Sequence, residues 1–106
     1  MANVYKNSKL DLTTTDVTTL YTCPAATTAV FKSILVSEDS GNADTVTATI
    51  TVGSTIFNLF KVKAVGANTT VELLTQPLVM NEAEILKFNA ATANRLHVVA
   101  SYLEIS

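Results

Sequence analysis

Apolar and polar residues alternate most regularly between positions 44 and 52. Within Asp44–Val52, the residues Val46, Ala48, Ile50 and Val52 fall at every second position, and threonines occupy the positions between them. Side chains of a β-strand point alternately to its two faces, so this spacing places the apolar residues together. The segment therefore predicts a strand with one face in a core and the other in water.

Short segments of similar composition recur along the chain. Valine and threonine are branched at Cβ and favour strands over helices, and polar loops with turn-forming residues separate the segments. Residues 1–12 read as an edge strand or an extended arm, with a strand over Val4–Leu12, and only Met80–Lys87 could form a helical turn. The other expected strands are Val17–Thr22, Thr28–Glu38, Thr55–Val62, Thr70–Leu74, Glu84–Asn89 and Arg95–Glu104.

These strands, about seven or eight in number, indicate an all-β protein. Their spacing of about 8–12 residues is typical of an antiparallel β-sandwich, because the connections are too short for the helices of a parallel sheet. A chain of 106 residues has the usual size of one domain. We therefore expect a single β-sandwich over residues 1–106, with a jelly-roll or an immunoglobulin-like strand order.

Two of the expected strands have apolar residues on both faces. Strict alternation in the strand over residues 28–38 separates Val30, Ile34 and Val36 from Phe31 and Leu35, which predicts a central strand covered on two sides. In the strand over residues 55–62 it separates Ile56 and Phe60 from Phe57 and Leu59.

The doubly apolar strand over residues 55–62 has two interpretations. It is either a central strand inside the sandwich or a strand whose second face contacts another subunit, and the apolar C-terminus raises the same question. The candidate protein-interface residues are therefore Ile56, Phe57, Leu59, Phe60, Tyr102, Leu103 and Ile105.

The charge balance excludes some classes of partner. A net charge of −2 and scattered basic residues are not the basic surface that binds nucleic acid, and no apolar run reaches the roughly 18 residues of a membrane span. Only 15% of residues are charged, which suggests burial against partners. The first residues lack the apolar core of a signal peptide, and a lone cysteine fits a reducing cytoplasm.

The inventory of reactive side chains predicts that the protein is not an enzyme. His97 is the only histidine and lies opposite Leu96 and Val98, as expected of a half-exposed strand histidine rather than a catalytic base. Cys23, the only cysteine, is expected to be a small apolar residue at a strand end. Pairs of nearby carboxylates such as Glu82 and Glu84 are the remaining catalytic possibility.

Metal and cofactor sites are also not expected. One histidine and one cysteine cannot supply a tetrahedral zinc site within one chain. The loop that contains Glu38, Asp39, Asn42 and Asp44 offers oxygen ligands for calcium, but its spacing fits a polar turn better than a calcium loop. We therefore predict no cofactor.

Two segments resemble a known group of proteins. The run Leu20–Ile34, which reads LYTCPAATTAVFKSI, resembles a segment of small virion proteins of tailed phages, including marine and cyanobacterial phages. The ending Asn94–Ile105 is similar to their closing strand. The resemblance covers most of the chain from about Leu10 onward, and Cys23 stands where such sequences often have valine.

This resemblance implies a structural component of the virion. The expected function is a capsid decoration, or cement, protein that binds across capsid subunits. Its implied partners are the major capsid protein or other virion proteins, with neither nucleic acid nor membrane, and it is expected to form a homo-oligomer, a trimer or dimer, after assembly in the host cytoplasm. The alternative is a receptor- or glycan-binding module on a tail or head fibre, in which Tyr5, Tyr21 and Tyr102 are the aromatic candidates.

Overall fold

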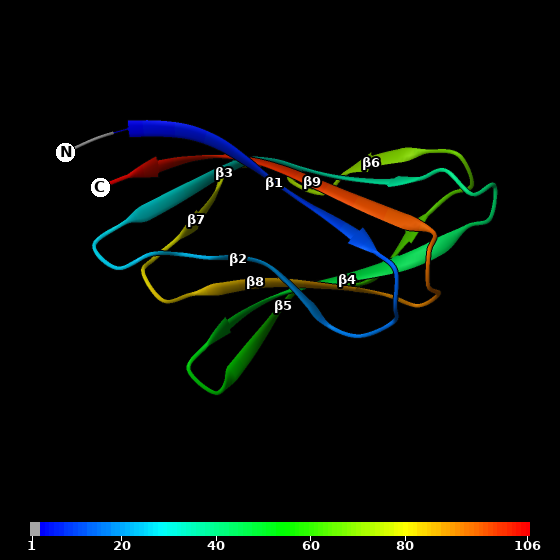
Figure 1. Ribbon diagram of the computed structural model, residues 1–106, viewed down its shortest axis with the longest axis horizontal. Helices are drawn as coiled ribbons and strands as arrows, with labels where there is room; N and C mark the ends of the chain where they lie inside the picture. Colours follow the sequence, from blue (N-terminus) through cyan, green and yellow to red (C-terminus); the bar gives the residue numbers. More distant parts are fainter. Residues whose placement is uncertain (1–2) are drawn as a thin grey trace.

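The computed structural model describes residues 3–106, which form nine strands in two antiparallel sheets and contain no helix (Figure 1). The all-β sandwich expected from the sequence is confirmed, and residues 1–2 of the expected N-terminal arm lie outside the described residues. The strands are β1 (Asn3–Leu12), β2 (Thr18–Thr22), β3 (Thr28–Glu38), β4 (Asp44–Val52), β5 (Thr55–Val65), β6 (Thr70–Glu72), β7 (Leu78–Met80), β8 (Ile85–Ala90) and β9 (Leu96–Ile105).

The strand order is that of a jelly roll. One sheet, sheet A, has the order β1-β9-β3-β6, with β7 also paired to β3, and the other, sheet B, has the order β2-β8-β4-β5. Successive strands from β1 to β4 alternate between the sheets, and the last strand pairs with the first. A jelly roll has eight strands. Because β6 and β7 pair with the same edge of β3, together they take the place of one of these eight strands.

The two inner faces form one apolar core. Alternation along β4 is as expected at Val46, Ala48 and Ile50, which are buried, whereas Val52 is exposed because the end of the strand projects beyond the sandwich. Sheet A contributes Leu12, Phe31, Ile34, Val36, Met80, Leu96, Val98, Ala100 and Tyr102, and sheet B contributes Tyr21, Val46, Ala48, Ile50, Leu86, Phe88 and Ala90.

A β-bulge in β3 changes which residues enter the core. The register with β9 shifts between Phe31 and Ser33, so one extra residue of β3 is accommodated and the alternation changes phase. Phe31 and Ile34 are consequently both buried, whereas Val30 and Leu35 point outward. The expectation that Phe31 and Ile34 lie on opposite faces of a doubly covered strand is therefore wrong.

Two further expectations about strands are corrected. Leu78–Met80 forms the short strand β7, so residues 3–106 contain one strand more than expected. The segment Met80–Lys87 contains a turn and then β8 rather than a helical turn. Strand β5 is at the edge of sheet B. The interpretation of residues 55–62 as a central strand inside the sandwich is therefore wrong.

A buried carboxylate organises two loops at one end of the sandwich. Glu38 ends β3 and is only 2% exposed. Its oxygens accept hydrogen bonds from the backbone N–H groups of Ser40 (2.8 Å), Gly41 (3.0 Å), Asn42 (3.1 Å) and Asn68 (3.1 Å), and from the Ser40 hydroxyl. Burial alone raises the pKa of Glu38, but these bonds outweigh it and lower the pKa to about 2.

Strand β5 contains a strained residue. Val62 has a φ of +54°, a backbone conformation that is unfavourable for a β-branched side chain. It lies in a bulge, because Val46 pairs with Lys63 whereas Ala48 pairs with Phe60. The Val62 N–H donates to Oγ1 of Thr47 at 3.1 Å, which helps to hold this conformation.

Replacing Val62 by glycine is expected to stabilise the protein by about 1 kcal/mol. Glycine adopts positive φ without steric cost, and the strain it removes, about 1–3 kcal/mol, exceeds the entropy that glycine loses on folding. The measurement is the midpoint of urea unfolding. Val79→Gly is the matched control, because Val79 is similarly exposed in a strand without positive φ and should lose stability. A loss in Val62→Gly as large as in the control would contradict the prediction.

Among residues 3–106 there is no helix long and apolar enough to cross a membrane.

Candidate functional site

An apolar row crosses the outer face of sheet A near the chain ends. Tyr5 pairs with Leu103, Leu103 pairs with Val30, and Val30 pairs with Val79, so four strands present these side chains side by side. Tyr5 is 77% exposed and Val79 is 54% exposed. Together with Ile105 on the same face of β9, they form a surface that we call the terminal patch: Tyr5, Val30, Val79, Leu103 and Ile105.

Alternation along β9 decides which of the candidate C-terminal residues reach this surface. Leu103 and Ile105 point outward and are half-buried, as the interface hypothesis requires. Tyr102 points inward and is only 5% exposed, with its ring stacked on that of Phe31 at 4.7 Å between centroids. Tyr102 is therefore a core residue, and the candidate interface excludes it.

Polar contacts anchor the sheet beneath the terminal patch. Glu104 accepts hydrogen bonds from Lys6 Nζ at 2.8 Å and from the Tyr21 hydroxyl at 2.5 Å, and so joins β9 to β1 and to the opposite sheet. The hydrogen bond from Lys6 is the main cause that lowers the pKa of Glu104, and the Tyr21 hydroxyl adds to it. Ser8 and the Tyr102 hydroxyl form a further hydrogen bond at 2.8 Å. The patch therefore lies on a well-anchored part of the fold.

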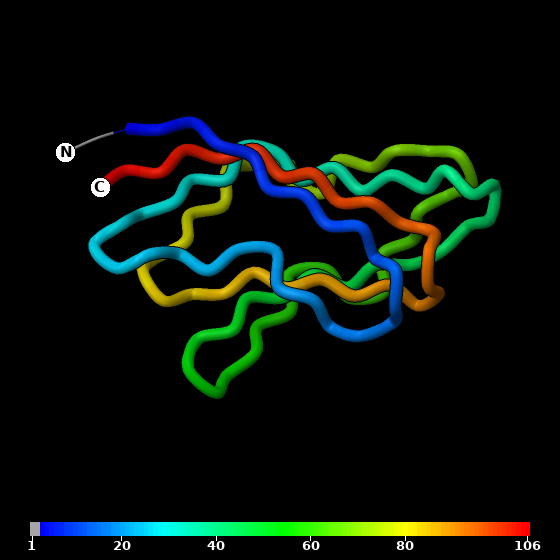
Figure 2. The backbone as a smooth tube through the Cα atoms, in the orientation of Figure 1, coloured from blue at the N-terminus to red at the C-terminus, as the bar shows by residue number. Residues whose placement is uncertain are grey.

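The remaining candidate residues lie on the β4–β5 hairpin, at the edge of sheet B. Gly53, with a φ of +60°, and Ser54 make the expected two-residue turn between Val52 and Thr55. The hairpin projects away from the body of the sandwich (Figures 1 and 2). Its end, which we call the hairpin tip, carries three apolar side chains in water: Val52, Ile56 and Phe57 are 42%, 63% and 54% exposed.

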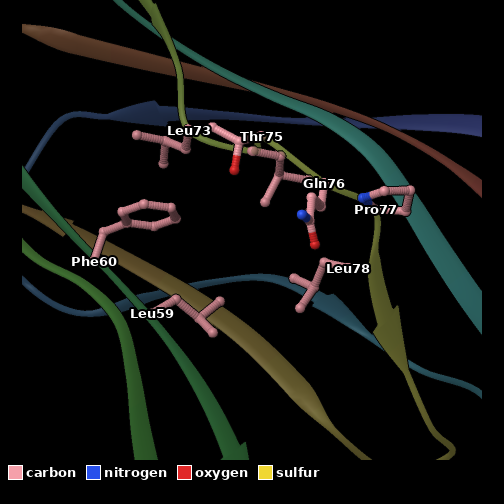
Figure 3. A pocket seen from close by; sticks show the side chains of 8 residues that line it. Leu59, Phe60, Leu73, Thr75, Gln76, Pro77 and Leu78 are labelled. Carbon is pink, nitrogen blue, oxygen red and sulfur yellow. The ribbon is translucent and has the colours of Figure 1, made fainter.

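An apolar groove adjoins the base of this hairpin. It lies between β5 and the β6–β7 segment, at the open edge between the two sheets, and encloses about 260 Å³. Side chains of Leu59, Phe60 and Leu78 face one another across it (Figure 3). The full lining is Leu59, Phe60, Leu73, Leu74, Thr75, Gln76, Pro77 and Leu78.

A second bulge in β5 explains why Leu59 and Phe60 line the same groove. Ala48 pairs with Phe60 whereas the next residue, Thr49, pairs with Asn58, so Leu59 is an extra residue in the ladder. Strict alternation had separated these two side chains. The segment Leu73–Leu78 was not a candidate, because its short apolar run next to Pro77 has no clear period.

Cys23 and His97, the residues considered for catalysis, lie in different environments. Cys23 is buried, and burial raises the pKa of its thiol. His97 is half-exposed, as expected, with Nε2 3.3 Å from Asp11 Oδ1 and Nδ1 3.6 Å from Asp39 Oδ2. These contacts join β9 to β1 and to the loop after β3.

The acidic residues bind the protein's own backbone. Asp44 Oδ2 accepts from the Thr92 N–H at 3.1 Å, Glu82 from the Ala26 N–H at 2.9 Å, and Glu84 from the Asn81 N–H at 2.9 Å. Glu38 is occupied by the loop amides described above. Within the part of the chain that the structure describes, no three side chains of histidine, cysteine, aspartate or glutamate cluster as a metal site.

Comparison of the sequence with known protein families and with curated proteins found no match.

Proposed function

We propose that this chain is a capsid decoration protein of a tailed phage, which attaches to the outside of the head through its terminal patch. The resemblance of Leu20–Ile34 and Asn94–Ile105 to small virion proteins supports the phage assignment. The jelly-roll order agrees with it, since viral capsid domains use this topology. The same topology serves other functions, so the proposal depends on the surface.

The terminal patch is the observation that carries the proposal. It presents an exposed tyrosine and valine with half-buried aliphatic side chains on the outer face of one sheet, and Glu104, Lys6 and Tyr21 anchor that sheet from below. Burying apolar surface gains roughly 25 cal/mol per Å², and a pre-ordered surface loses little entropy on binding. A small contact repeated over many capsid subunits would then raise the cost of separating them.

A structural function also agrees with the state of the reactive side chains. A thiol acts as a nucleophile in its thiolate form, which the raised pKa and burial of Cys23 disfavour. The half-exposed His97 is placed between Asp11 and Asp39 rather than beside a hydroxyl or thiol nucleophile.

The fibre-associated glycan-binding alternative receives less support. Sugar-binding surfaces rely on exposed aromatic rings, and two of the three tyrosines, Tyr21 and Tyr102, are in the core. Among residues 3–106 the exposed aromatic rings are Tyr5 and Phe57, which lie on different sheets. We therefore retain the decoration protein as the proposed function.

Rebinding to stripped phage heads tests this proposal. Mild denaturant should release the chain from virions, as detected by mass spectrometry, and purified chain should rebind to the stripped heads. Val79→Asp in the patch should weaken rebinding at least about tenfold, because a charge would be buried against the capsid. Val17→Asp is the matched control, since Val17 is also exposed but lies outside the patch. Detection of the chain only in tails would refute the proposal, and equal rebinding of both variants would refute the assigned surface.

A further inference from the structure

Within residues 3–106 no other segment covers the hairpin tip. A two-stranded ribbon beyond a sandwich has no core of its own and is marginally stable in water. The ribbon nevertheless places Val52, Ile56 and Phe57 in solvent. Val52 and Phe57 share one face of the ribbon and Ile56 lies on the other, and apolar side chains gathered in solvent in this way mark an interaction site.

The groove beside the tip is apolar as well. Its 260 Å³ are lined mainly by leucines, Phe60 and Pro77, and the space is open to solvent at the edge of the sandwich. Apolar side chains offer water few hydrogen bonds, so water there is easily displaced. An aromatic or aliphatic side chain that entered from outside would pack against both sheets at once.

The charge distribution around both features favours a protein as the occupant. Residues 45–60, which include the tip and one wall of the groove, contain no charged side chain, and neither do residues 73–81, which form the other wall. Depletion of charged residues marks the core of protein–protein interfaces. Surfaces that bind nucleic acid or lie on membranes carry lysine and arginine instead.

The geometry points to self-association in which the hairpin tip of one copy inserts Phe57 into the groove of a second copy. Strand β5 carries Phe57 at the tip and contributes Leu59 and Phe60 to the groove, so every chain holds both halves of the contact at one edge. Two copies related by a two-fold axis can fill both grooves at once, which makes a closed, isologous pair. This inference does not depend on where the protein is located, because it uses only these residues.

Sedimentation of the purified chain tests the inference. At a concentration of about 100 µM the wild-type chain should sediment with twice the 11.3 kDa mass of one chain. Phe57→Asp should raise the dissociation constant at least about tenfold by placing a charge in the apolar groove. Thr75→Trp should do the same from the other side, since it fills the groove and leaves the tip intact. Phe57 and Thr75 are both exposed, and circular dichroism checks that both variants fold.

Complementation separates this contact from other modes of association. A mixture of Phe57→Asp and Thr75→Trp contains one intact tip and one intact groove, and should form mixed pairs that neither variant forms alone. Val79→Asp, at a position exposed to the same extent as Phe57, should leave the pair intact. A monomeric wild type, association unaffected by Phe57→Asp, or association lost only in Val79→Asp would overturn the inference. The rebinding assay measures the proposed attachment to phage heads separately.

Discussion

Replacing Phe31 by alanine is expected to lower the free energy of unfolding by about 3–5 kcal/mol, the usual cost of removing a buried phenylalanine. Phe31 is fully buried and stands at the centre of an aromatic cluster. Its ring contacts Tyr21 edge-on at 5.3 Å and stacks on Tyr102 at 4.7 Å, measured between ring centroids. The substitution leaves a cavity where the two sheets meet and removes both aromatic contacts, each worth about 0.5–1.5 kcal/mol.

Urea unfolding followed by circular dichroism measures this loss. Phe31→Leu should lose much less than Phe31→Ala, because leucine refills most of the space. Tyr5→Ala is the surface control, since Tyr5 is an aromatic residue that is mostly exposed, and its loss should stay below about 1 kcal/mol. Similar losses in Phe31→Ala and Tyr5→Ala would show that Phe31 does not occupy the core.

Replacing Glu38 by glutamine is the second large expected effect, with a fall in Tm on the order of 10 °C at about pH 7. The carboxylate accepts four backbone N–H bonds from two loops, and bonds to an ionised acceptor are roughly twice as strong as neutral ones. A glutamine side chain has one acceptor oxygen and an amino group. That group would face the backbone donors of the same loops, so several buried N–H groups would lose their partner.

The same carboxylate predicts how wild-type stability depends on pH. The pKa of Glu38 is lowered from 4.5 to about 2 on folding, so the unfolded state takes up a proton first as the pH falls. Its contribution is therefore fully present above about pH 5 and is lost progressively between about pH 4.5 and pH 2. The difference in unfolding midpoint between wild type and Glu38→Gln should shrink across this range.

A matched carboxylate shows whether the effect belongs to this site. Asp16→Asn removes one negative charge from an exposed position. It should leave Tm nearly unchanged at about pH 7 and keep the wild-type loss of stability below about pH 4.5. If Glu38→Gln instead follows the wild-type pH profile in parallel, the carboxylate does not stabilise the loops in its ionised form.

The fold class could be predicted because most strands obey their local pattern. Residues 28–38 and 44–52 form strands with the expected bounds, and Gly53-Ser54 makes the expected turn. The strand order could not be predicted from the local alternation of apolar and polar residues, because the pairing of β9 with both β1 and β3 depends on contacts between distant parts of the chain. Strand β7 was missed because three residues beside Pro77 are too few to show a period.

The candidate surfaces were only partly predictable, since bulges change the phase of alternation without a sequence signal. The bulge after Phe31 turns Val30 outward to join the terminal patch, and the one at Leu59 directs this side chain into the groove with Phe60. Tyr102 is a different case. Period two alone separates it from Leu103 and Ile105, so its core position could have been recognised from the alternation in β9.

The place of β9 in sheet A also has a consequence for biosynthesis. This strand is the last of the nine, yet it lies between β1 and β3 and pairs with both along its length. Translation at about 5–20 residues per second needs about 3–12 s to proceed from Glu38, the end of β3, to Leu96. During that interval β1 and β3 have emerged without the strand that joins them, and their apolar faces are available to chaperones or to neighbouring nascent chains on the same messenger.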